Sequence, residues 1–221
     1  MGISDKINSF KSNLPQGVTL VAVSKTKPSA MIREAYDSGH RIFGENRVQE
    51  MTDKAAELPD DIQWHAIGHL QRNKVKDIVP FVSMIHAVDS LRLLKEINKQ
   101  AKKVDRVIPC LLQFHIAEES SKYGLSMEEA TEILTGESFA VMENVSIQGV
   151  MGMATFTDNM EQVRNEFKTL KRIFDQLKAE TFQDSEVFKE ISMGMSGDYE
   201  IAIEEGSTMV RIGSTLFGAR D

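Results

Sequence analysis

The sequence predicts an α/β fold, a single closed (β/α)8 barrel of the TIM type with one extra helix at its N-terminus. Eight short runs of β-branched and apolar residues recur along the 221 residues, and amphipathic stretches separate most of them. Strands that alternate with helices form a mainly parallel sheet covered by helices. Eight such units in a chain of this length favour a closed barrel, so we expect residues 1–221 to form one domain.

The strands should span residues 18–25, 41–46, 62–68, 84–89, 107–116, 147–154, 190–196 and 209–217. Before the first strand, Ile3, Ile7, Phe10 and Leu14 follow helical spacing and predict the extra helix. After it, Pro28 suits the first turn of a helix, where its missing N–H would be unpaired anyway. An open doubly wound sheet is the alternative, and it is less favoured because no G-x-G-x-x-G follows the first strand.

Two of the connecting stretches show one apolar face each. The longer stripe comprises Met160, Val163, Phe167, Leu170, Ile173, Phe174 and Leu177, and the shorter one Val48, Met51, Ala55 and Leu58. Spacings of three and four residues are those of a helix that buries one side. Both stretches are therefore expected to cover the sheet.

Composition excludes several classes of function. The chain has 33 acidic residues and 26 Lys and Arg, which gives a net charge of −7, and the basic residues are scattered. No basic surface for nucleic acid is therefore expected. No apolar run reaches the roughly 18 residues of a membrane span, and the N-terminus has no signal-peptide core. The one cysteine, Cys110, has apolar neighbours and is expected to be a buried structural thiol. We expect a cytoplasmic protein without nucleic-acid or membrane partners.

The first strand closes on a lysine. By the period of two, Val21, Val23 and Lys25 share one face. If that face points inward, the Lys25 amine rises into the mouth of the barrel, where desolvation would lower its pKa and make it a nucleophile able to form a Schiff base. The alternative is that Lys25 and Lys27 form a solvated pair in a loop.

The last two strands end in small polar residues. Ser196 and Gly197 precede a short predicted helix, where free backbone N–H groups attract an anion, and Gly213 and Ser214 close the eighth strand. Neighbouring ends of this kind form either a phosphate cradle or merely two tight turns. A Schiff-base lysine opposite a phosphate cradle, with Arg211 between, suits pyridoxal 5'-phosphate, but equally a barrel aldolase acting on a phosphorylated sugar.

Several motifs appear in a fixed order between residues 18 and 218. They are residues 21–28 (VAVSKTKP), 43–46 (FGEN), 48–50, 64–65, 67–68, 70–71, 122–124, 192–196, Asp198 and 211–214. In this ordered set the chain resembles the pyridoxal phosphate homeostasis family (YggS/PROSC type), whose barrel is akin to the N-terminal domain of bacterial alanine racemase. The sequence differs from the family pattern at His115 and at residues 153–156. These differences affect the expected lining of the pocket and not the cofactor site.

The resemblance implies that pyridoxal 5'-phosphate is bound as an aldimine on Lys25, the first lysine of the motif, with Lys27 the poorer candidate. It implies a cofactor site made of Lys25, Asn46, Ser196, Arg211, Ile212, Gly213 and Ser214. Ser196, Gly213 and Ser214 would hold the phosphate, Arg211 would face the pyridine nitrogen and Asn46 would lie beside the cofactor. No metal site is expected, since His65 and His69 do not share a helical face.

The main hypothesis is a carrier and buffer of pyridoxal 5'-phosphate without clear catalytic activity. A guanidinium stays protonated and disfavours a protonated pyridine ring, so Arg211 would weaken the cofactor as an electron sink. The related racemase takes a catalytic tyrosine from a second domain that we expect to be absent here, leaving Tyr123 and His115 as candidate pocket residues. The alternatives are a racemase using the same cofactor and a cofactor-free sugar-phosphate lyase or isomerase. The family leans towards a monomer, with apo-enzymes as candidate partners.

Overall fold

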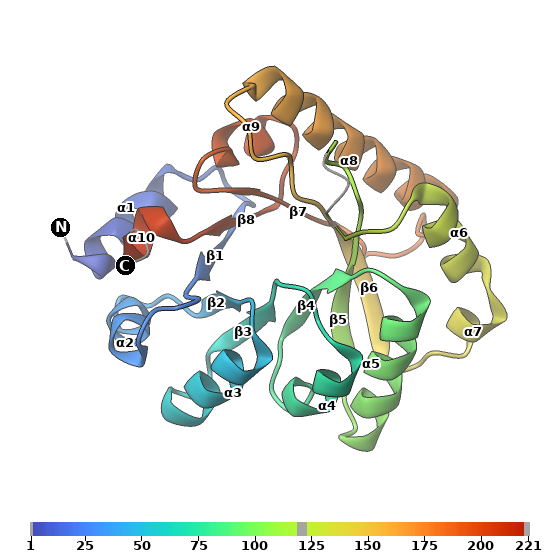
Figure 1. Ribbon diagram of the computed structural model, residues 1–221, viewed down its shortest axis with the longest axis horizontal. Coiled ribbons are helices and arrows are strands. Elements are labelled where there is room, and N and C mark those ends of the chain that lie inside the picture. Colours follow the sequence, from blue (N-terminus) through green and yellow to red (C-terminus); the bar gives the residue numbers. More distant parts are fainter. Residues whose placement is uncertain (1, 119–122, 219–221) are drawn as a thin grey trace.

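A computed structural model describes residues 2–118 and 123–218, so Lys122 of the motif at 122–124 lies outside the described residues. Eight parallel strands close into a barrel in the order β1 to β8, with β8 paired to β1. Figure 1 shows the strands at the centre and the helices around them. The predicted fold class is confirmed.

The strands are shorter than the sequence predicts. They are β1 (Thr19–Val23), β2 (Ile42–Glu45), β3 (Gln63–Ala66), β4 (Met84–Val88), β5 (Ile108–Gln113), β6 (Val145–Met151), β7 (Glu190–Met195) and β8 (Met209–Ile212). The prediction for residues 209–217 is wrong in its second half, since a four-residue helix replaces the strand there. Gly213 has φ −120° and ψ −75°, which turns the chain out of the sheet immediately after Ile212.

Helices follow most strands on the outside of the barrel. They are α1 (Ile3–Asn13), α2 (Ser29–Asp37), α3 (Val48–Glu57), the 3-10 turn η1 (Arg72–Lys74), α4 (Val75–Ile78), α5 (Leu91–Lys103), α6 (Met127–Thr135), α7 (Glu137–Ala140), α8 (Met160–Glu180), α9 (Tyr199–Glu204) and α10 (Ser214–Phe217). The predicted N-terminal helix is α1, which lies beside α10 (Figure 1). Pro28 is the residue that precedes α2 and not its first residue. Within residues 2–118 and 123–218, no helix combines the length and apolar character needed to cross a membrane.

Two apolar clusters lie on opposite sides of the sheet. The larger packs the helices onto the strands and includes Leu20 and Ala22, whereas the smaller fills the barrel interior and includes Val21 and Val23. The alternation predicted for the first strand is therefore confirmed, with the face of residues 21 and 23 inward. Position 25 lies two residues past the end of β1, in the turn that follows this strand at the C-terminal end of the barrel.

Candidate functional site

A cavity of about 600 Å³ opens at the C-terminal ends of the strands. This volume lies within the roughly 300–1,000 Å³ that is usual for small-molecule sites. It is lined by Val23, Lys25, Thr26, Lys27, Asn46, Ile67, Met153–Asp158, Met160, Val163, Met195–Asp198, Arg211, Gly213, Ser214 and Gly218. Active sites in this architecture collect at this end of the barrel.

Lys25, predicted to close the first strand, lies past its end, and both lysines of the motif lie on the turn between β1 and α2. Lys25 and Lys27 are both half-buried and both line the cavity, so neither is a fully solvated loop lysine. Between them, Thr26 has φ +65°, a left-handed conformation that is uncommon for a β-branched residue. A strained residue between two lysines indicates that the surrounding structure holds this turn in place.

The ends of β7 and β8 meet, as the sequence predicts. The backbone N–H of Gly213 donates to Ser196 Oγ across 3.3 Å, and both residues line the cavity with Ser214. Gly213 lies beside β1, because a Cβ at this position would come 3.3 Å from the carbonyl oxygen of Val23. The small polar corner therefore stands next to the strand that leads to Lys25.

Arg211 lies on the inner face of β8 at the bottom of this cavity. It is buried; Nη1 donates to the Ser192 carbonyl oxygen (2.8 Å) and to Ser192 Oγ (2.6 Å), and Nη2 donates to the Gly152 carbonyl oxygen (3.0 Å). Burial lowers the pKa of its guanidinium to about 10, an effect that Asp198 opposes, so the group stays charged at neutral pH. The hydrogen bonds fix the direction in which this charge faces.

Sequence reasoning missed a chain of polar groups that continues from Arg211 through the barrel. His86 Nδ1 lies 3.0 Å from Ser192 Oγ, and His65 Nδ1 lies 2.9 Å from His86 Nε2. We call these four residues, His65, His86, Ser192 and Arg211, the barrel histidine chain. Burial lowers the pKa of His65 to about 3 and that of His86 well below its ordinary value, so both rings are neutral at pH 7.

A second polar cluster lies behind the lysine turn, on the helix side of the sheet. Lys54 Nζ donates to Glu45 Oε1 (2.7 Å), Glu50 Oε1 (2.6 Å) and the Ser24 carbonyl oxygen (2.8 Å). We call Ser24, Glu45, Glu50 and Lys54 the turn cluster. One signal could have revealed it, because Lys54 stands three residues after Met51 and four before Leu58, within the apolar stripe of its helix.

Of the seven predicted site residues, the structure brings six to the cavity. The exception is Ile212, whose side chain is fully buried in the helix-side core and away from the cavity. Tyr123 and His115 are exposed and do not line the cavity, and Tyr123 instead stacks on His69 with ring centroids 4.5 Å apart. In place of these two, the connection between β6 and α8 forms one wall.

Two further expectations concern cysteine and metal. Cys110 is buried, and burial raises the pKa of its thiol. This suits a structural residue and not a nucleophile. In the part of the chain that the structure describes, no group of three or more His, Cys, Asp or Glu side chains is arranged to hold a metal ion.

The barrel and its site define the class of protein, and sequence comparison agrees with them. The family model of the alanine racemase N-terminal domain matches residues 2–221. A pyridoxal phosphate homeostasis protein from Aquifex aeolicus is 41% identical over 202 residues, which cover 91% of this chain and 86% of that protein. The human protein of the same name is 40% identical and covers 91% of this chain and 76% of its own length. The chain therefore belongs to the alanine racemase N-terminal domain family and, within it, to the pyridoxal phosphate homeostasis proteins.

Solved structures show the same relation. PipY of Synechococcus elongatus with pyridoxal phosphate bound is 35% identical, has a TM-score of 0.88, and the match covers 98% of this chain and all of that one. Alanine racemase from Bartonella henselae has a TM-score of 0.74, but it is 16% identical and the match covers only 58% of its chain. The racemase shares the fold, and the predicted family is confirmed.

Proposed function

We propose that this protein binds pyridoxal 5'-phosphate covalently on Lys25 and carries and buffers it for the cell. Membership of the homeostasis family supports the proposal, since a relative of this family has been solved with the cofactor bound. The observation that carries it is structural. One cavity holds an amine on a constrained turn, a buried guanidinium and a corner of serines and glycine.

The donor set fits the chemistry of this cofactor. The cofactor is an aldehyde, which condenses with a lysine amine by forming a C=N bond and releasing its oxygen as water. Its phosphate accepts hydrogen bonds, and Ser196, Gly213 and Ser214 would offer hydroxyl and backbone N–H donors to it at one corner of the cavity. Its pyridine nitrogen is an acceptor, which suits the charged Arg211.

Arg211 also supports the proposal that the protein carries the cofactor without using it for catalysis. Its guanidinium is oriented by three hydrogen bonds, and its charge would keep a proton off a ring nitrogen that faced it. A neutral pyridine is a weaker electron sink, so abstraction of an α-proton from an amino acid is disfavoured. Incubation of the loaded protein with L-amino acids in deuterated water should leave their α-positions unlabelled, and robust exchange would indicate a racemase.

The attachment site is tested by borohydride reduction followed by peptide mapping. We expect one adduct, on Lys25, and a visible absorption band that Lys25→Ala abolishes and that Lys27→Ala retains. An undiminished band in Lys25→Ala would assign the bond to another lysine. A protein without any adduct would contradict the proposal and favour an enzyme that needs no cofactor.

The setting and partners extend the proposal. We infer that the protein acts in the cytoplasm, where its single buried thiol stays reduced, and delivers the cofactor to apo-enzymes. We infer that it does so as a monomer. Mixing the loaded protein with an apo-enzyme and following recovered activity tests delivery, and light scattering of the loaded protein tests the oligomeric state.

A further inference from the structure

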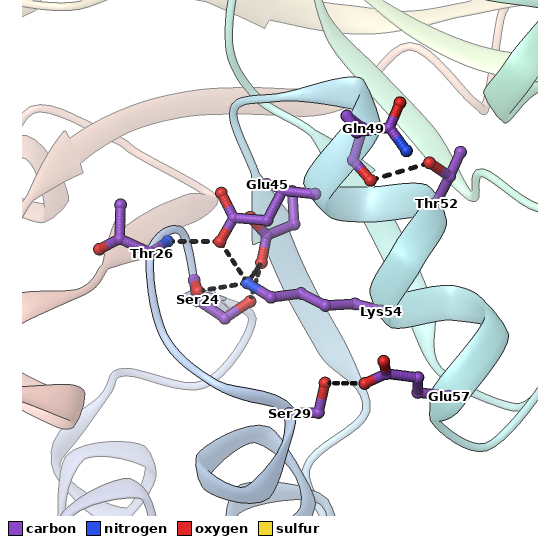
Figure 2. Close-up of polar contacts among 9 residues, drawn as sticks. Ser24, Thr26, Ser29, Glu45, Gln49, Thr52, Lys54 and Glu57 are labelled. Carbon is purple, nitrogen blue, oxygen red and sulfur yellow. Dashed lines mark hydrogen bonds and ion pairs between the residues drawn. The ribbon is translucent and has the colours of Figure 1, made fainter.

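Polar clusters hold two walls of the cavity in place. One wall is the turn between β1 and α2, where Lys54 of α3 donates to the Ser24 carbonyl oxygen (Figure 2). The other wall is made by residues 153–158, which belong to the connection between β6 and α8 and all line the cavity. We call residues 153–158 the wall segment.

The wall segment begins beside a residue whose backbone is fixed. The Gly152 carbonyl oxygen accepts from Arg211 Nη2 at 3.0 Å. A Cβ on Gly152 would come 2.7 Å from Ile116 Cδ1 and 3.0 Å from Leu170 Cδ2, so the backbone there packs directly against both side chains. The start of this wall is therefore held by the guanidinium that also lines the cavity.

Three residues further on, Thr155 is held through both of its donors. Its backbone N–H donates to Glu166 Oε2 at 2.6 Å, and its hydroxyl donates to Glu166 Oε1 at 2.7 Å. Both oxygens of one carboxylate on α8 thus bind a single residue of the wall. Met153 and Ala154 lie between two fixed points, Gly152 and Thr155.

The same carboxylate joins a third segment of the chain. The backbone N–H of Glu118, which follows β5, donates to Glu166 Oε1 and to Thr155 Oγ1, both at 3.2 Å. Gln162 Nε2 donates to Glu166 Oε1 and to Glu118 Oε2, again at 3.2 Å. We call Glu118, Thr155, Gln162 and Glu166 the wall cluster.

Glu166 is a buried charge that these hydrogen bonds stabilise. It follows Val163 by three residues on the buried face of α8 and is only 5% exposed. Burial by itself would raise the pKa of its carboxyl, but hydrogen bonds from Thr155, Glu118 and Gln162 hold the pKa below its ordinary value. Since a buried carboxylate that loses its donors is strongly destabilised, the wall cluster resists movement of Thr155 away from α8.

We propose that Glu166 is a positioning residue of the cofactor site, which holds the wall segment in place and thereby slows the loss of bound pyridoxal 5'-phosphate. Glu166 acts through Thr155 and does not line the cavity itself. A wall that stays in place limits the entry of water and of small amines, which must reach the reactive carbon before the cofactor can leave. The inference rests on the proposed function and adds a residue that governs retention.

The test compares Glu166→Gln with Glu161→Gln. Glu166→Gln keeps the volume but replaces one acceptor oxygen by an amide NH₂, so a donor of Thr155 or Glu118 loses its partner. Each loaded protein is mixed with excess hydroxylamine, and the loss of its visible absorption band gives the rate of cofactor capture. This rate should rise about tenfold in Glu166→Gln, the effect of losing one charge-assisted hydrogen bond. Glu161 is exposed on the first turn of α8, and its variant should keep the wild-type rate.

Two variants of Thr155 test the same contact from the other side. Thr155→Val removes the hydroxyl that donates to Glu166 Oε1 and should raise the capture rate by less than Glu166→Gln, because the backbone N–H still donates. Thr155→Ser keeps the hydroxyl and should stay near the wild-type rate. This pair decides the matter should Glu166→Gln not fold.

A further measurement needs no cofactor. Hydrogen exchange of the Thr155 and Glu118 amides in the apo-protein should accelerate in Glu166→Gln and stay unchanged in Glu161→Gln. The acceleration at these two amides should exceed that at the amides of the barrel strands. A residue that only stabilised the fold would accelerate both groups of amides equally.

The outcomes are distinguishable. A wild-type protein that shows no visible band after incubation with pyridoxal 5'-phosphate overturns the proposed function and this inference with it. A wild-type band that hydroxylamine removes at the same rate from folded Glu166→Gln and Thr155→Val overturns the inference alone. Equal acceleration of capture in Glu161→Gln also overturns it, and so does equal acceleration of exchange throughout the barrel, because Glu166 would then not act through the wall segment.

Discussion

The turn cluster and the barrel histidine chain support the same cavity by opposite means. The turn cluster lies on the helix side of the sheet and joins a lysine to two carboxylates. The barrel histidine chain lies inside the barrel and joins neutral rings and a hydroxyl to one guanidinium. The first holds the backbone beside Lys25, whereas the second orients Arg211.

The contrast shows how burial decides which polar groups a site can use. An ammonium group buried between the helices and the sheet needs a facing carboxylate, since a buried charge without a partner is strongly destabilising. Histidines at the same depth avoid that requirement by losing their proton. The two clusters should therefore respond differently to mutation and to pH.

The largest change in the free energy of unfolding is expected when the turn cluster loses its lysine. Lys54→Ala leaves Glu45 buried without its cation and should lower the free energy of unfolding by about 3–5 kcal/mol. Urea denaturation followed by circular dichroism measures it. The double variant Lys54→Met with Glu45→Gln should recover most of the loss, and equal losses in both would show that the charges are not what matters.

The next effect belongs to the barrel histidine chain and appears on acidification. The unfolded chain protonates its histidines near pH 6.5, whereas folded His65 resists protonation down to a pKa of about 3. The unfolded state thus binds more protons in this interval, so the free energy of unfolding falls with falling pH, by roughly 1 kcal/mol per pH unit for such a histidine. Urea midpoints between pH 7 and pH 4.5 measure the slope. His65→Gln should flatten it, and an unchanged slope would contradict a neutral buried His65.

A smaller effect on the free energy of unfolding is expected at Ser192, which links the two histidines to Arg211 within the barrel histidine chain. Ser192→Ala removes the hydroxyl that contacts both His86 and Arg211, and should cost about 1–3 kcal/mol of stability because buried groups lose a partner. Ser12→Ala, an exposed hydroxyl on α1, is the control. A loss no larger than that of Ser12→Ala would mean that the histidines and Arg211 do not stabilise each other through Ser192.

The smallest change in the free energy of unfolding is expected for an exposed ion pair, which tests whether burial explains the effect of Lys54→Ala. Lys171 pairs with Asp175 one turn along α8, at 2.6 Å, as closely as Lys54 pairs with Glu50. Both side chains are exposed, so Lys171→Ala should change the free energy of unfolding by less than about 0.5 kcal/mol. A loss comparable to that of Lys54→Ala would attribute the stabilisation to the ion pair itself and not to its burial.

Much of the fold could be predicted because its signals are local. The alternation of Val21 and Val23 with Leu20 and Ala22 predicts that β1 has two distinct faces, and the structure shows that Val21 and Val23 face the barrel interior. Strand ends were less predictable. The segment 209–217 has apolar residues near both ends, but the conformation of Gly213 divides it into a strand and a helix.

What the sequence by itself determined is the order of strands and helices, the alternation of side chains along β1 and the placement of Lys25, Arg211 and the small polar residues at or near strand ends. The tertiary structure alone decided which side chains meet. His86 and Ser192 are 106 residues apart and belong to strands that are not neighbours, so only closure of the barrel brings them within 3.0 Å. Periodicity describes one element at a time, whereas a buried polar group is satisfied by whichever partner the closed fold places beside it.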